Sequence, residues 1–167
     1  MKSSRLFETQ LTRRRFLIGA AALGLLPASV RRLWAELGAD QLALLEKSEF
    51  VYMSSTRQDG TLGEPAEIWF FMHEGDLFVG TRPDSWRVKR IGWGRPQAKI
   101  WIGKRDGPSY RAIGSIEKDA ALQAKLLEVY AKKYPKGWKK WEASFREGFA
   151  DGSRVLVRYR ASTEPQG

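Results

Sequence analysis

Hydroxyl and basic side chains gather in one short stretch of the chain. Thr81 and Arg82 end a run of strand-forming residues, and Ser85, Arg87 and Lys89 follow at the start of a short predicted helix. Hydroxyls, cations and the free amides of a helix N-terminus all bind anions, and together they suit a phosphate group. The stretch therefore predicts a phosphate pocket, with a solvated basic helix face as the alternative.

The residues that the chain lacks exclude several other kinds of chemistry. It contains no cysteine, so disulfides, thiolate nucleophiles and thiolate metal ligands are ruled out. Its single histidine, His73, stands in a predicted turn and cannot build a site of several histidines, so we expect no metal site. Neither a Ser-His-Asp set nor paired carboxylates can be recognised, and the catalytic residues stay unknown.

The positive charge of the chain is unevenly distributed. The formal net charge is +10, but residues 1–35 carry six of these charges and the remainder only four. Duplex nucleic acid usually requires a basic stripe. We therefore expect no nucleic-acid partner, although a pI of about 10.0 would suit a barrel that binds single strands.

Residues 1–35 have the pattern of an export signal. The sequence TRRRFL at 12–17 resembles a twin-arginine signal, and an uncharged run follows at 16–30. This run is shorter than the roughly 20 residues of a membrane-spanning helix. The resemblance implies that the twin-arginine machinery exports the protein to the periplasm or another extracytoplasmic location, folded and carrying a cofactor. No clean cleavage site follows, so cleavage and retention as a membrane anchor both stay open.

The remaining residues, 36–161, are predicted to form one domain, with a flexible tail at 162–167. Alternating and β-branched runs between turn signals predict strands, and a period of 3.6 residues predicts helices. The strands are expected at 50–56, 67–72, 77–81, 97–102, 110–116 and 154–160, and the helices at 37–46, 85–91, 122–130 and 138–149. Because hairpin turns link successive strands, the sheet should be antiparallel. The order predicts a mainly β fold with helices (α+β), a six-stranded antiparallel barrel with a helical pair before the last strand.

This order of elements resembles the pyridoxamine 5'-phosphate oxidase-like superfamily, the flavin-binding split barrels. The resemblance covers residues 48–160, and its most specific parts are Asp59-Gly60, Pro65 and WFF at 69–71, followed by GDLFVGTR at 75–82. It implies a homodimeric split barrel that binds FMN and acts as a flavin-dependent oxidoreductase on a small-molecule substrate. The alternatives are a deazaflavin coenzyme, haem, or a binding module without turnover.

The resemblance also implies where the cofactor lies. Its phosphate would bind the hydroxyl and basic stretch, and its ring would lie along the strand that begins near residue 67. The expected cofactor-binding residues are Glu67, Ile68, Trp69, Phe70, Gly80, Thr81, Arg82, Ser85, Arg87 and Lys89. Oxidase members often have Arg or Lys on the ring-binding strand, whereas this chain has Glu67. The substrate and the choice between FMN and a deazaflavin therefore stay open, and the lone histidine makes haem the less expected cofactor.

Overall fold

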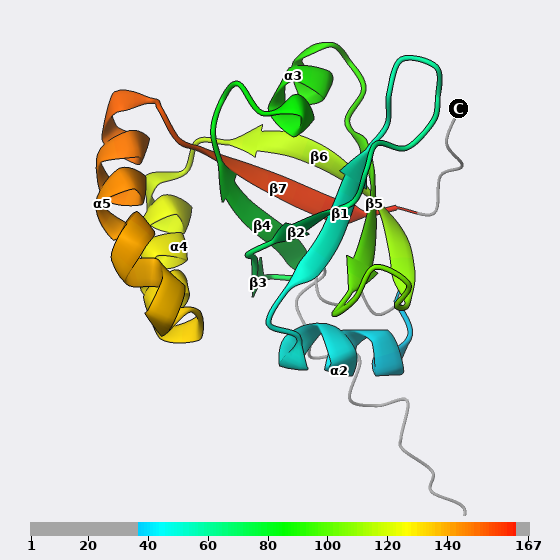
Figure 1. Ribbon diagram of the computed structural model, residues 1–167, viewed down its shortest axis with the longest axis horizontal. Coiled ribbons are helices and arrows are strands. Elements are labelled where there is room, and N and C mark those ends of the chain that lie inside the picture. Colours follow the sequence, from blue (N-terminus) through cyan, green and yellow to red (C-terminus); the bar gives the residue numbers. More distant parts are fainter. Residues whose placement is uncertain (1–36, 163–167) are drawn as a thin grey trace, which may run out of the picture.

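The computed structural model describes residues 37–162, which form a curled antiparallel sheet surrounded by helices (Figure 1). The strands of this region are β1 (Val51–Ser55), β2 (Ala66–Ile68), β3 (Phe71–His73), β4 (Asp76–Thr81), β5 (Gln97–Ile102), β6 (Ser109–Glu117) and β7 (Val155–Ala161). The helices are α2 (Ala39–Lys47), α3 (Trp86–Gly92), α4 (Ala120–Lys133) and α5 (Pro135–Asp151). No helix between residues 37 and 162 is long and apolar enough to cross a membrane. The predicted signal at 1–35 and the tail after residue 162 lie outside the described residues.

One kinked strand joins the two ends of the sheet. The strand order is β2-β1-β5-β6-β7-β4-β3, and all neighbouring strands are antiparallel. β2 and β3 lie at opposite ends of this order, yet only Trp69 and Phe70 separate them in the sequence. The chain thus passes directly from one sheet edge to the other, and the predicted split barrel with a helical pair before the last strand is confirmed. The single strand expected at 67–72 is two short strands, so the described sheet has seven strands instead of six.

Two tyrosines from α4 and the residue after it hold this kink. The Tyr134 hydroxyl accepts a hydrogen bond from the Phe70 N–H at 2.9 Å and lies 3.1 Å from the Phe70 carbonyl oxygen. The Tyr130 hydroxyl donates to the Trp69 carbonyl at 2.7 Å. Buried backbone groups need partners, and these hydroxyls take the place of strand neighbours at the kink.

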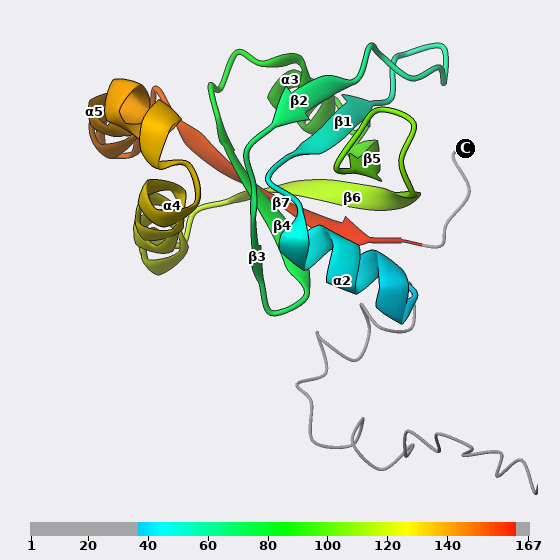
Figure 2. The ribbon, with the colours of Figure 1, turned by 60° about the horizontal axis from the view of Figure 1, so that its bottom comes forward.

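The helical pair packs on β4, where Gly80 leaves room for it (Figure 2). A Cβ atom at Gly80 would lie 2.5 Å from the Phe145 ring and 2.9 Å from a methyl carbon of Leu126. Tyr130 and Trp138 belong to the same apolar core, and each is at most 3% exposed. A larger residue at position 80 would therefore push α4 and α5 away from the sheet. A separate core fills the barrel with side chains that include Val51, Met53, Leu77, Val79, Ile100, Ile102 and Val157.

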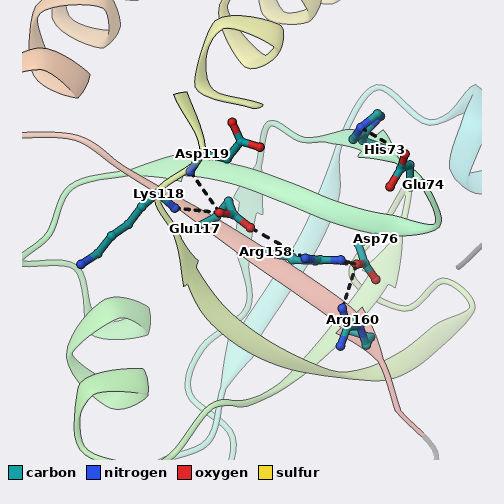
Figure 3. A network of polar contacts seen from close by, with 8 residues as sticks. All are labelled: His73, Glu74, Asp76, Glu117, Lys118, Asp119, Arg158 and Arg160. Carbon is teal, nitrogen blue, oxygen red and sulfur yellow. Dashed lines mark hydrogen bonds and ion pairs between the residues drawn. The ribbon is translucent and has the colours of Figure 1, made fainter. Parts of the chain in front are cut away.

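A polar network at the start of β4 connects three strands (Figure 3). The Asp76 carboxylate is buried, accepts a hydrogen bond from Arg158 Nε at 2.5 Å and lies 3.6 Å from the Arg160 guanidinium. Arg158 also lies 3.8 Å from the Glu117 carboxylate. Because both arginines belong to β7 and Glu117 ends β6, the network fixes these strands against β4. Its charges are paired with one another, which indicates a structural role.

Helix α3 begins one residue later than the sequence pattern indicates. Ser85 occupies its N-cap position, but the Ser85 side chain makes no capping hydrogen bond. The preceding residue, Asp84, accepts a hydrogen bond from Arg82 Nε at 2.9 Å. The Ser85 hydroxyl therefore makes no hydrogen bond to the N-terminus of α3.

Candidate functional site

Two neighbouring clefts meet where β4 leads into α3, and both are lined by Thr81 and Arg87. The larger, which we call the basic cleft, has a volume of about 510 Å³ and lies between β1, the loop before β2 and α3. The smaller, the aromatic cleft, has a volume of about 210 Å³ and lies between β2, β4 and the helical pair. The basic cleft is lined by the basic residues Arg57, Arg87 and Arg90 and by one acidic residue, Glu64. The aromatic cleft is lined by the aromatic residues Trp69, Tyr130, Trp141 and Phe145.

Ser85 lines the basic cleft, and its hydroxyl is buried. Its Oγ atom has no hydrogen-bond partner among the described residues. A buried polar group without a partner costs about 1–3 kcal/mol, so such a group next to a cleft suggests that a ligand supplies the missing bond. Because a serine hydroxyl donates to oxyanions, a phosphate or carboxylate oxygen would satisfy it.

Arg87 brings an unpaired positive charge to the same place. Its Nη1 atom contacts the sulfur of Met53 at 3.7 Å, and no carboxylate within residues 37–162 lies at ion-pair distance. A guanidinium binds phosphate or carboxylate through two parallel N–H groups, which a thioether sulfur does not replace. Arg87 is therefore available to an anion in either cleft.

Arg90 and Arg57 add to the positive charge of the basic cleft, although neither was among the residues expected to bind the cofactor. Arg90 Nη1 donates to the Ser55 carbonyl at 2.6 Å and to the Ser55 hydroxyl at 2.8 Å. Burial lowers the pKa of Arg90, and the guanidinium groups of Arg57 and Arg95 lower it further. An anion in this cleft would relieve the repulsion between these cations. Helical spacing could have identified Arg90 as a site residue, because it stands three residues after Arg87 on the same helix.

Most of the expected cofactor residues line one of the two clefts. They are Glu67, Ile68, Trp69, Gly80, Thr81, Ser85 and Arg87. Phe70 does not, because its side chain is 1% exposed and lies in the barrel core. Lys89 is exposed, with Nζ 5.2 Å from the centre of the Trp86 ring, and lines neither cleft. Arg82 is paired with Asp84 and lines a separate hollow.

Glu67, the unexpected carboxylate on the ring-binding strand, is paired with a tyrosine. The Tyr52 hydroxyl donates to Glu67 Oε2 at 2.7 Å. This hydrogen bond raises the pKa of Tyr52, because it stabilises the protonated phenol. Arg87 and Arg154 also line the aromatic cleft. The cleft is therefore lined by two arginines and by one acidic residue, Glu67.

One wall of the aromatic cleft is formed by closely packed rings. Trp69 stacks on Tyr134 with ring centres 4.4 Å apart and an angle of 5°, and it meets Tyr130 edge-on at 5.7 Å. Gly137 makes room for this arrangement, because a Cβ atom there would lie 2.5 Å from the Trp69 ring. A fixed aromatic wall of this kind suits a flat, partly apolar ligand.

His73 lines neither cleft. Its Nδ1 atom lies 2.9 Å from Lys125 Nζ. Within the part of the chain that the structure describes, no three His, Asp or Glu side chains are grouped to hold a metal ion.

The curled antiparallel sheet and the clefts at the end of β4 define a split-barrel protein. No family model matches the chain, and no curated protein matches it. Its fold is similar to that of a candidate pyridoxamine 5'-phosphate oxidase from Listeria innocua, with 16% identity over 74% of this chain and 92% of that chain and a TM-score of 0.55. HutZ, the heme storage protein from Vibrio cholerae, is 12% identical over 77% of this chain and 92% of that chain, with a TM-score of 0.53.

A third similar structure is a protein from Clostridium acetobutylicum that is related to general stress protein 26, of the pyridoxinephosphate oxidase family. It is 15% identical over 73% of this chain and 81% of that chain, with a TM-score of 0.52. At these identities the likeness shows only that the chain shares the split-barrel fold of these proteins.

Proposed function

We propose that this chain binds FMN and acts as a flavin-dependent oxidoreductase on a small molecule. The observation that carries the proposal is the buried Ser85 hydroxyl, which has no partner within residues 37–162, in a cleft that is also lined by Arg87, which is paired with no carboxylate of these residues. A phosphate monoester would accept a hydrogen bond from the first and pair with the second. The similarity in fold to a member of the pyridoxinephosphate oxidase family supports this choice of cofactor, and a deazaflavin coenzyme is the alternative.

The two clefts suggest how the cofactor would be held. Thr81, Ser85 and Arg87 would bind its phosphate, and the basic cleft is within the roughly 300–1,000 Å³ of ordinary small-molecule sites. The ring would lie along β2, at the boundary where Ile68 and Trp69 begin the aromatic cleft. When bound, the flavin would supply the hydride or electron transfer, and the protein would orient it and exclude water.

Haem binding, the function named for one similar structure, has less support here. The one histidine of the chain is held by Lys125 and lines neither cleft. A flavin-binding module without turnover stays as the second candidate, because no catalytic side chain is assigned.

We expect Ser85→Ala and Arg87→Ala to bind FMN roughly ten- to a hundredfold more weakly than the natural protein. Each change removes a charge-assisted hydrogen bond of about 1.5–3 kcal/mol. Flavin occupancy, measured from the visible absorption of the purified protein and by mass spectrometry of the released ligand, tests this expectation. Lys89→Ala is the matched control on α3 and should keep its flavin.

Equal occupancy in all three variants would overturn the assignment of the phosphate site, and a natural protein that takes up no FMN would overturn the cofactor. Turnover requires a further measurement. Reduction of the bound flavin by a nicotinamide donor, followed by oxidation with a small-molecule acceptor over many cycles, would distinguish an oxidoreductase from a binding module.

A further inference from the structure

Arg154 lines the aromatic cleft and has no role in the phosphate site. It also lines the adjacent hollow that contains Arg82 and Ser144. Arg154 follows Gly152, which ends α5 in the left-handed conformation with φ 81°. Its backbone N–H donates to the Gly148 carbonyl at 2.8 Å, so the residue is fixed against the last turn of α5.

The side chain of Arg154 runs through a notch in α5. A Cβ atom at Gly148 would lie 2.3 Å from Cγ of Arg154, so a larger residue there would displace the arginine. Arg154 Nη2 donates to the Ser144 hydroxyl at 2.8 Å. The guanidinium carbon lies 4.7 Å from the centre of the Phe145 ring and 5.7 Å from that of Trp141. These contacts hold the guanidinium in one place beside the cleft.

All of these partners are neutral, so the charge of Arg154 is not compensated. No carboxylate among residues 37–162 lies at ion-pair distance from it. Burial lowers the pKa of Arg154, and the positive charge of Arg82 lowers it further. Glu67, the carboxylate that lines the aromatic cleft, is bound by the Tyr52 hydroxyl.

We infer that Arg154 binds the carboxylate of a small aromatic acid whose ring lies in the aromatic cleft. A cleft of about 210 Å³ is smaller than ordinary drug-sized sites and suits a single ring. Trp141, which is 41% exposed, provides a surface on which that ring can stack. Because the two clefts share Thr81 and Arg87, the acid would lie next to the cofactor. Its role as the substrate rests on the proposed function, whereas its binding does not.

Calorimetric titration of the purified full-length protein with benzoate and with neutral benzamide tests this inference. Benzoate should bind, and benzamide should bind roughly ten- to a hundredfold more weakly, because it lacks the charge that pairs with the guanidinium. Arg154→Gln should remove this preference. Ser144→Ala leaves Arg154 in place and introduces a good helix former. It should weaken benzoate binding less than Arg154→Gln does. Arg146→Gln is the control on α5, because Arg146 is exposed and pairs with Glu142.

Undiminished benzoate binding by Arg154→Gln, or no binding by the natural protein, would overturn the inference. If Arg154→Gln does not fold, as judged by circular dichroism, an unchanged affinity in Ser144→Ala would also overturn it. Flavin occupancy is recorded on the same samples. Protein without flavin that binds benzoate through Arg154 would contradict only the proposed function, whereas flavin-loaded protein without this binding would contradict only the inference.

Discussion

The ammonium group of Lys133 is partly buried against uncharged groups. Its Nζ atom lies 3.4 Å from the centre of the Phe70 ring and 3.3 Å from the Phe70 carbonyl oxygen. Burial lowers the pKa of Lys133 from its ordinary value of 10.5 to about 8, although Glu49 acts in the opposite direction. The carbonyl and the ring compensate only part of what the cation loses when it leaves water.

We expect Lys133 to make the free energy of unfolding rise between about pH 8 and pH 10. In this window the unfolded chain retains a proton that the folded protein has released, so raising the pH favours the folded state. Below pH 8 both states are protonated and this contribution is constant. Urea unfolding at several pH values should show the rise in the natural protein and not in Lys133→Met.

Lys139→Met is the control for this measurement, because Lys139 is exposed on α5. Above pH 10 buried tyrosines such as Tyr130, whose pKa is raised by burial, act in the opposite direction. A rise of the same size in Lys133→Met would show that another group causes it.

The kink between β2 and β3 depends on hydroxyl groups from the helical pair. Tyr134→Phe should lower the free energy of unfolding by about 1–3 kcal/mol, because it leaves the buried Phe70 N–H without its partner. Tyr159→Phe is the matched comparison, since the Tyr159 hydroxyl is buried and has no partner among the described residues. Its removal should be neutral or stabilising. Equal losses for the two variants in urea unfolding would contradict this account of the kink.

Local signals in the sequence predict most elements of the fold. Asp59-Gly60 marks the turn after β1, and the turn before β4 is formed by Glu74 and Gly75, both with positive φ. The kink at Trp69 and Phe70 is not predicted, because its backbone partners come from tyrosines far along the chain. A strand pattern describes the residues of the strand and does not identify such partners.

The residues of the candidate site were likewise only partly predictable from the sequence. Ser85 and Arg87 are close in sequence, and a single stretch identified both. Arg57 and Arg154 come from distant segments, and only the curling of the sheet and the packing of α5 bring them to the clefts.

We propose that the whole protein is exported by the twin-arginine route. Arg13→Lys combined with Arg14→Lys should leave the protein folded in the cytoplasm, because the paired arginines are the part of the signal that the export machinery reads. Cell fractionation followed by immunodetection measures the distribution. Export of the double variant, or export in cells without this machinery, would contradict the proposal.

The exposed aromatic surface of α3 supports a second proposal, that the protein is a homodimer. Trp86 and Trp93 are 64% and 57% exposed, and their ring centres are 6.3 Å apart. Large apolar groups exposed side by side are typical of interaction surfaces, and stable interfaces bury roughly 800 Å² on each partner.

Light scattering at micromolar concentration should therefore give twice the chain mass of 19.0 kDa. Trp93→Ser should shift the protein toward the monomer with little change in the stability of the monomer, because Trp93 lines neither cleft and is mostly exposed. Leu44→Ser, which changes an exposed apolar residue on α2, should leave the dimer intact. A monomer with cofactor bound would contradict the homodimer, and a dimer that is unaffected by Trp93→Ser would show that the interface lies elsewhere than on α3.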